Sequence, residues 1–304
     1  MTKTLPVYLA ALGAVSALGR GKPEILANLM AGGRPNLVPR TDLLVDGASV
    51  YVGEVPGDLP EVPEALRPYD CRNLRLAVAA AEEIRPEIED ARARFGTDRI
   101  ALVVGTSTSG IAVGEEAVRV VRETGRLPDD FDMRRQETGS VSESLARYLG
   151  VGGPALTVST ACSSGSHAMA SGRRLLRSGL ADAVIVGGAD SLCRLTVNGF
   201  QALSALSSGI CNPMSRNRDG TSIGEGAALF LMQREEAEIA LYGVGSSTEA
   251  YSMTAPEPDG THVEQAINRA LTDAGMIPGD IDYIQLHGTG TVQNDAMESK
   301  AIKR

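Results

Sequence analysis

The sequence contains few cysteines, and no pattern pairs them. Four occur in 304 residues, far apart and without a C-x-x-C pair, and no histidine lies at metal-ligand spacing from them. Neither a disulfide framework nor a zinc site is therefore predicted, and we expect no bound metal. The four are Cys71, Cys162, Cys193 and Cys211.

Long hydrophobic runs are also missing, and no stretch has the length that spans a bilayer. Residues 1–19 imitate a secretory signal peptide, because Lys3 precedes an apolar run with small residues. We interpret Val7 to Leu12 instead as the opening strand of an α/β domain, followed by a helix from Pro23 to Met30. The protein is therefore expected to be cytoplasmic, without a membrane partner.

The chain contains fewer basic than acidic residues. The 29 lysines and arginines face 38 acidic residues, for a net charge of -9. This balance argues against general nucleic-acid binding. The loop after Gly105 lacks the Gly-Lys-Ser/Thr ending of a phosphate loop, so nucleotide binding is not expected either. With 43% apolar and 22% charged residues, the chain should form one large or two modest globular domains.

The chain does contain a strand that breaks sharply into a helix at a cysteine. Thr157 and Val158 favour a buried strand, and the small residues after Ser163 favour a tightly packed helix start. Cys162 stands at the break, where unpaired backbone NH groups and the helix dipole would stabilise a thiolate. That position suits covalent acyl chemistry, with a buried structural cysteine as the alternative.

Strand and helix patterns alternate along the first 238 residues, which indicates a largely parallel sheet covered on both faces. Residues 33–68 are rich in proline and glycine and should form loops and short strands. Strands are predicted at 99–106, 154–158, 183–190 and 226–232, and helices at 69–84, 114–124, 139–149 and 164–178.

The pattern then restarts. Residues 239–247 are similar to 8–16, and residues 282–291 to 100–108, which predicts two related halves, 1–238 and 239–304. The second half has no counterparts of the strands near Cys162, Ala183 and Ala227. We therefore expect a C-terminally truncated version of a longer protein, or one piece of a split one, with an exposed apolar sheet edge.

His287 is the second candidate for chemistry. It follows a predicted strand from Asp282, at the carboxyl end, where catalytic groups gather in parallel α/β folds. The glycines and threonines beside it allow close backbone approach and hydroxyl contacts to a ligand, although a lone histidine is more often structural. His167 should face the packing, about 140° around its helix from Cys162. His262 should be exposed near the start of a helix over 261–274.

Four motifs in this order resemble those of the β-ketoacyl-acyl-carrier-protein synthases of the KAS I/II type, with polyketide ketosynthases as close relatives. The resemblance extends from the first strand to the end of the chain. It implies an α/β, thiolase-like fold of two duplicated βαβαβ halves in a layered α-β-α-β-α arrangement, with the second half incomplete here. The motifs are Thr160-Ala-Cys-Ser-Ser-Gly, Gly187-Gly-Ala-Asp, Arg218-Asp-Gly with Gly224-Glu-Gly-Ala, and His287-Gly-Thr-Gly-Thr.

The resemblance also implies roles for single residues. Cys162 matches the nucleophile that takes an acyl chain from acyl carrier protein, with its own backbone NH as an oxyanion donor. His287 matches one of two histidines that hydrogen-bond the malonyl thioester carbonyl and stabilise the enolate formed on loss of CO2. Thr254, Thr289 and Thr291 match positions that contact the pantetheine arm.

Further residues are placed by the same resemblance. Ile111 falls where the family lines its acyl pocket, and Glu298 matches an acidic residue beneath the site. Arg67, Arg72 and Arg75 are candidates for docking the acidic carrier, with a solvated helix face as the alternative. No cofactor is implied, since substrates are carried on the phosphopantetheine of acyl carrier protein. A homodimer or a heterodimer with a related ketosynthase subunit is expected.

The sequence departs from the family pattern towards its end. The second histidine, in a Gly-His-x-x-Gly-Ala-Ala-Gly segment, the lysine before it, and a Gly-Phe-Gly-Gly loop have no match. We expect a 3-oxoacyl-acyl-carrier-protein synthase that catalyses decarboxylative Claisen condensation in fatty acid, polyene or polyketide synthesis, with this chain inactive or impaired. The alternatives are a thiolase-type acyltransferase, which His287-Gly-Thr-Gly-Thr disfavours, and a non-catalytic partner subunit, which the retained Cys162 disfavours.

Overall fold

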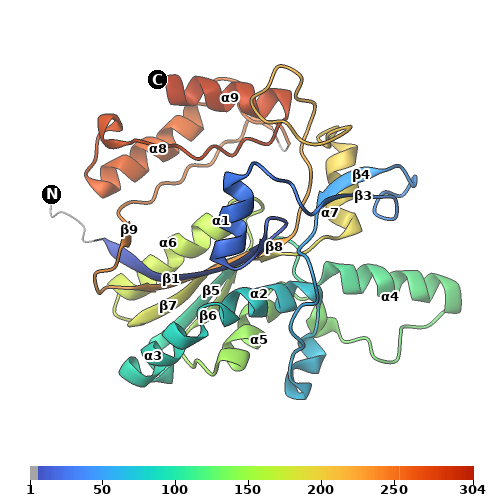
Figure 1. Cartoon of the computed structure of the whole chain (residues 1–304), viewed down its shortest axis with the longest axis horizontal. Coiled ribbons are helices and arrows are strands. Elements are labelled where there is room, and N and C mark those ends of the chain that lie inside the picture. The colour runs from blue at the N-terminus through green and yellow to red at the C-terminus, as the bar shows by residue number, and fades with distance from the viewer. Residues whose placement is uncertain (1–5, 253) are drawn as a thin grey trace.

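A mixed sheet of seven strands forms the centre of the computed structural model, which describes residues 6–252 and 254–304 (Figure 1). Lys3, which belongs to the amino-terminal stretch analysed above, lies outside the described residues. Strand β9 (Ile239–Leu241) pairs with β1 (Val7–Ser16) and lies outside the main order of strands. That order is β2 (Gly19–Arg20), β1 (Val7–Ser16), β8 (Gly226–Gln233), β7 (Ala183–Asp190), β5 (Ile100–Gly105), β6 (Ala155–Val158).

The strand directions correct the prediction of a largely parallel sheet. Strand β5 runs parallel to β6 and to β7, as predicted. Strand β8, however, is antiparallel to both β7 and β1. The reason is that residues 191–225 return the chain to the end of the sheet where β7 finishes, so that Gly226 pairs with Asp190.

Helices cover both faces of this sheet, which confirms that prediction (Figure 1). Helices α2 (Arg72–Glu82), α3 (Arg85–Phe95) and α5 (Ser140–Leu149) lie on one face, and α6 (Ser164–Arg177) lies on the other. The apolar side chains of α2 are buried, and this helix contacts β1, β8 and β7. Strand β5 is buried along its whole length.

Most of the remaining elements of the first half follow the predictions with shifted bounds. Residues 33–68 contain β3 (Leu37–Arg40), β4 (Val50–Gly53) and the start of the 3-10 helix η1 (Glu64–Tyr69). The predicted helix over 69–84 is shorter, because Pro68 lies in η1 and the chain is extended at Cys71 before α2 begins. Helices α1 (Lys22–Met30) and α4 (Ile111–Thr124) correspond to predicted helices. The structure adds three helices that were not predicted: η2 (Thr97–Arg99), η3 (Met133–Arg135) and α7 (Arg194–Ala202).

Strand β6, which leads to Cys162, is not the buried central strand that the sequence predicts. It forms the edge of the sheet and pairs only with β5 among the described residues. Leu156 is accordingly 44% exposed. An edge strand has one neighbour instead of two, and its composition alone does not reveal this difference.

The second half contains β9 (Ile239–Leu241), α8 (Thr261–Ala274), η4 (Pro278–Asp280) and α9 (Val292–Lys303). Helix α8 has the predicted bounds, but residues 281–290 form no strand. In the described chain no neighbouring strand pairs with them, and Tyr283 is 75% exposed. None of the helices in this part of the chain, or elsewhere in 6–252 and 254–304, combines the length and apolar character needed to cross a membrane.

The end of β5 touches the first turn of α6. A Cβ atom at Gly105 would lie 2.4 Å from the carbonyl carbon of Ser164 and 2.7 Å from the amide nitrogen of Gly165. Only glycine permits this approach, and it brings the start of α6 against the carboxyl end of the central strands.

Candidate active site

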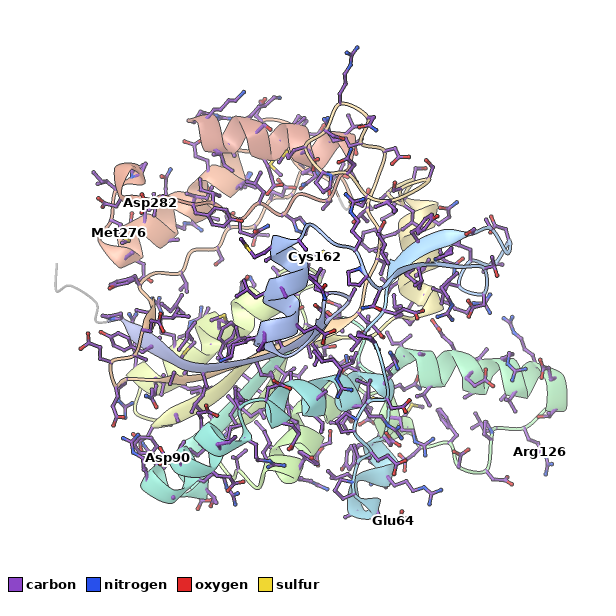
Figure 2. All side chains as sticks on the ribbon, in the orientation of Figure 1. Glu64, Asp90, Arg126, Cys162, Met276 and Asp282 are labelled. Atoms are coloured by element: carbon purple, nitrogen blue, oxygen red, sulfur yellow. The ribbon has the colours of Figure 1, made fainter. Side chains whose placement is uncertain are left out.

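Cys162 lies in the tight turn between β6 and α6. Ala161 has a φ of 52°, in the left-handed region that residues with a side chain rarely adopt. The Ser164 hydroxyl closes this turn, because it accepts from the Thr160 amide at 2.9 Å and donates to the Ala161 carbonyl at 2.6 Å. The turn holds the Cys162 side chain on the surface, between the sheet and the carboxyl-terminal helices (Figure 2).

The backbone amides near Cys162 differ from those predicted for a helix start. The Ser163 and Ser164 amides already donate to the carbonyls of Thr160 and Ala161, at 3.3 and 3.0 Å. The Cys162 thiol instead receives a hydrogen bond from its own amide, which contributes to lowering its pKa.

His287 is the group that acts most strongly on Cys162. Its imidazole hydrogen-bonds the thiol, and this contact is the main reason why the pKa of Cys162 lies below that of an ordinary cysteine, against the opposing effect of desolvation. The same hydrogen bond raises the pKa of His287 above that of an ordinary histidine. Residues 125 positions apart thus meet as a thiol and imidazole pair, which favours the nucleophilic thiolate.

Two carboxylates on α9 hold the loop that carries His287. Glu298 is 7% exposed, and it accepts from the amides of His287 and Gly288 at 2.7 and 2.8 Å. Asp295, only 1% exposed, accepts from the amide of Gly290 at 3.1 Å. Because both acceptors lie on one helix, one turn apart, they fix the His287 backbone relative to α9.

Asp295 also connects this loop to the irregular segment before β8. It accepts from the Met214 amide at 2.7 Å and forms an ion pair with Arg218 at 3.5 Å. Arg218 belongs to one of the sequence motifs, whereas no motif assigned a role to Asp295. Asp295 lies three residues before Glu298 on the same face of α9, and this spacing was the sequence feature that could have predicted its role.

The threonines of the His287 loop hydrogen-bond each other. The hydroxyls of Thr289 and Thr291 lie 2.9 Å apart, and Thr291 caps α9 by accepting from the Asn294 amide. Thr254 is exposed, and its amide donates to the Ser252 hydroxyl at 3.3 Å. Their contact with a pantetheine arm stays a prediction.

Ile111 is half-buried at the start of α4, where its amide donates to the Thr108 carbonyl. The preceding loop is organised by Asp190, the last residue of β7. One oxygen of Asp190 accepts from the amides of Ser107 and Thr108, at 2.7 and 2.9 Å, and from both neighbouring threonine hydroxyls. Ser107 in turn lies 3.4 Å from Ser164 in the Cys162 turn. The loop that carries Ile111 is thus anchored beside the turn, and its role in an acyl pocket stays a prediction.

The three predicted docking arginines differ in their partners. Arg72 forms a bidentate ion pair with the buried Glu225, one contact of which measures 2.7 Å. Arg75 pairs with Asp70 through two contacts of 2.7 and 2.6 Å. Arg67 is the most exposed of the three and pairs weakly with Glu64, at 3.4 Å. Two of the three positive charges are therefore neutralised within the chain.

Among the other cysteines, the half-buried Cys211 contacts the His287 loop, because its thiol donates to the Thr289 carbonyl at 3.6 Å. Cys71 and Cys193 are buried, and burial raises the pKa of each thiol. His167 is half-buried on α6. His262 is not exposed as predicted: it is half-buried, because its ring lies 2.7 Å from Glu257.

Comparison with known proteins adds independent observations. The profile described as "Beta-ketoacyl synthase, N-terminal domain" matches residues 72–238, and that described as "Beta-ketoacyl synthase, C-terminal domain" matches residues 237–304. The "Tetracenomycin polyketide synthase ketoacyl synthase alpha subunit" of Streptomyces glaucescens is 32% identical, over 98% of this chain and 76% of the relative. The "3-oxoacyl-[acyl-carrier-protein] synthase 2" of Synechocystis is 30% identical over the same shares.

Among solved structures, the "Ketosynthase (ApeO) in Complex with its Chain Length Factor (ApeC) from Xenorhabdus doucetiae" superimposes with a TM-score of 0.94. The identity is 44%, over 100% of this chain and 76% of that chain. This likeness confirms the predicted α/β fold class. Among the described residues of the second half, β9 is the one strand, and it pairs with β1 of the first half.

The hydrogen bond from His287 predicts the reactivity of Cys162. Alkylation by iodoacetamide should modify Cys162 first, with a pH midpoint below that of an ordinary thiol. The His287→Gln variant should raise this midpoint and slow the reaction near neutral pH, by up to about tenfold for each unit of pKa. Peptide mapping after limited labelling at a series of pH values measures both effects. Preferential labelling of Cys71, Cys193 or Cys211, or a midpoint that the variant leaves unchanged, would count against the assignment.

Proposed function

We propose that Cys162 and His287 form the acyl-transfer centre of this chain, which belongs to the beta-ketoacyl synthase family. The chain is an acyltransferase of the 3-oxoacyl-acyl-carrier-protein synthase type, whose reaction is the decarboxylative condensation of an acyl thioester with malonyl-acyl carrier protein. The observation that carries the residue assignment is the hydrogen bond between the thiol and the imidazole, which lowers the pKa of the thiol.

The first step is transfer of the acyl chain to Cys162. The thiolate attacks the thioester carbonyl of the acyl carrier, and the new carbon–sulfur bond places negative charge on the carbonyl oxygen. The Cys162 amide is the available backbone donor to that oxygen. Collapse of the intermediate expels the pantetheine thiolate, which takes a proton from the His287 imidazolium. The products are acyl-Cys162, a free pantetheine thiol and a neutral imidazole.

Acylation then changes the state of His287. The contact that raises the pKa of His287 is the one with the Cys162 thiol, and this contact loses its charge when the sulfur carries an acyl group. A neutral imidazole can donate its NH to the malonyl thioester carbonyl. Loss of CO2 leaves an enolate, whose carbon attacks the acyl group. A carbon–carbon bond forms, the bond to sulfur breaks, and the Cys162 thiolate is regenerated.

Decarboxylation depends here on a single imidazole. Of the three histidines in the 304 residues, His287 is the one whose hydrogen bond lowers the pKa of the Cys162 thiol. Removal of one donor from such a site typically lowers the rate by about 10²- to 10³-fold. We therefore expect this chain to acylate Cys162 more readily than it completes condensation.

The partners we propose are acyl carrier protein and a second, related subunit. The ApeO structure contains a ketosynthase with its chain length factor, so this chain could occupy either place in such a heterodimer. The Cys162–His287 pair favours the condensing subunit, because a partner without chemistry would need no activated thiol. Substrates carried on phosphopantetheine require no further cofactor, and a cytoplasmic location suits such substrates. The division into 1–238 and 239–304 stays a prediction.

Acyl transfer from acyl-acyl carrier protein tests the assignment. The purified chain should gain the mass of one acyl group, located at Cys162 by peptide mapping, and Cys162→Ala should gain none. Release of CO2 from malonyl-acyl carrier protein should stay near background in the same preparation. An acyl mass on another residue would overturn the nucleophile. Rapid CO2 release that Cys162→Ala abolishes would show that one imidazole suffices.

Carrier docking is best tested at Arg67 alone. Reversal of Arg72 would leave Glu225 buried without its partner and destabilise the fold, so its effect on binding could not be interpreted. Arg67→Glu should weaken acyl carrier protein binding, chiefly by slowing association, and should reduce the dependence of binding on salt. Arg126→Glu, in the loop just beyond α4 (Figure 2), is the matched control and should bind normally. Equal binding by the two variants would remove Arg67 from the docking surface.

A further inference from the structure

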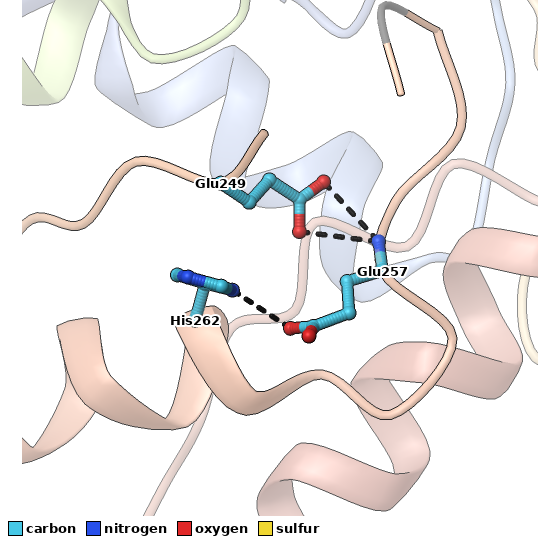
Figure 3. A group of neighbouring side chains, drawn as sticks. All are labelled: Glu249, Glu257 and His262. Carbon is cyan, nitrogen blue, oxygen red and sulfur yellow. Dashed lines mark hydrogen bonds and ion pairs between the residues drawn. The ribbon is translucent and has the colours of Figure 1, made fainter. Parts of the chain in front are cut away.

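Three side chains with metal-ligating atoms meet outside the active site. Glu249, Glu257 and His262 each offer one ligand atom, and these atoms all lie within 4.8 Å of one another (Figure 3). The three side chains are half-buried. No sequence pattern predicted this cluster. The three residues are separated by intervals of eight and five, which match no familiar metal-ligand spacing.

The backbone around the cluster already orients these groups. Both oxygens of Glu249 accept from the Glu257 amide, at 3.2 and 3.1 Å. The Glu257 carboxylate lies 2.7 Å from Nδ1 of His262, in the first turn of α8. The Ser247 hydroxyl donates to the His262 carbonyl at 2.5 Å, which ties the preceding segment to the same turn. The three ligand groups therefore converge before any ion binds.

The charge of the cluster is not balanced by a neighbouring base. Some carboxylates that approach other chain segments meet arginine: Glu225 meets Arg72, and Asp182 meets Arg99. In the part of the chain that the structure describes, no lysine or arginine pairs with Glu249 or Glu257. With a neutral imidazole, two negative charges are left close together at a half-buried position, which a divalent cation would neutralise.

We propose that Glu249, Glu257 and His262 bind a divalent first-row transition ion, with Zn²⁺ as the representative. One imidazole nitrogen and two carboxylates suit such an ion, and water would complete a tetrahedral site. Calcium and magnesium prefer oxygen ligands throughout. Two ligand atoms at about 2.0 Å from a tetrahedral ion lie about 3.3 Å apart, so Nδ1 and the Glu257 oxygen need to separate only slightly from 2.7 Å. Nδ1 binds without its proton, which stays on Nε2 or is released to solvent if the ring was charged.

The position of the site indicates what the ion would do. Glu249 and Glu257 flank the exposed Thr254, and the ion would join both to α8. A ligand that binds only the folded chain raises its stability, so the ion should increase the melting temperature. This inference concerns binding and stability and does not depend on the acyl-transfer reaction.

Titration with Co²⁺ tests the site, because the visible spectrum of the bound ion reports both its coordination geometry and the type of its ligands. The chain is first treated with EDTA and kept under a phosphine reductant. One equivalent of Co²⁺ should produce the visible bands of a tetrahedral ion without the charge-transfer band of thiolate ligation, and excess Zn²⁺ should displace it. His262→Gln and Glu249→Gln should each weaken binding by at least about tenfold. Glu264→Gln is the matched control, because Glu264 lies in the same turn of α8 as His262 but pairs with Arg304 beyond α9. This variant should bind like the wild type.

Circular dichroism in EDTA shows whether each variant is folded, and thermal unfolding with and without Zn²⁺ gives a second measure of binding. The proposal is overturned if the wild-type chain binds no stoichiometric Co²⁺, if the spectrum shows thiolate ligation, or if folded His262→Gln binds as tightly as Glu264→Gln. The wild-type spectrum decides the question even where a variant fails to fold.

Discussion

The hydrogen bond between Cys162 and His287 is the contact on which the chemistry of this chain depends. It connects the turn after β6 with the loop before α9, two segments that no shared sheet joins in the described chain. Each partner changes the other, since the imidazole lowers the pKa of the thiol and the thiol raises that of the imidazole. Either segment by itself would hold an ordinary cysteine or an ordinary histidine.

Carboxylates that accept hydrogen bonds from backbone NH groups hold the two partners of this contact in position. Glu298 and Asp295 hold the His287 loop from α9, and Asp190 holds the loop beside the Cys162 turn from β7. These acids act on the backbone, so they position the reacting groups without taking part in the reaction. Because Asp295 also meets Arg218, its charge is compensated at a position with almost no exposure to solvent.

Much of the fold could be predicted because its elements have strong local signals. Strand β7 is a continuous apolar run, and α8 has a clear start and end at glycine residues. The failures concern partners that a local pattern does not contain. The exposure of β6 depends on its place at the sheet edge, and residues 281–290 have a strand sequence but no strand to pair with. In the site, Cys162 and His287 were predictable from their motifs, whereas Asp295 and the surroundings of His262 depend on folded neighbours.

The titration of His287 tests the central contact most directly. Nuclear magnetic resonance of histidine-labelled protein resolves the three imidazoles, and His287→Gln identifies the signal. We predict that His287 titrates above the ordinary histidine value of about 6.5, and that Cys162→Ala moves the pKa of His287 downwards. The same His287 midpoint in the wild type and in Cys162→Ala would show that the two side chains do not interact, and would contradict the account.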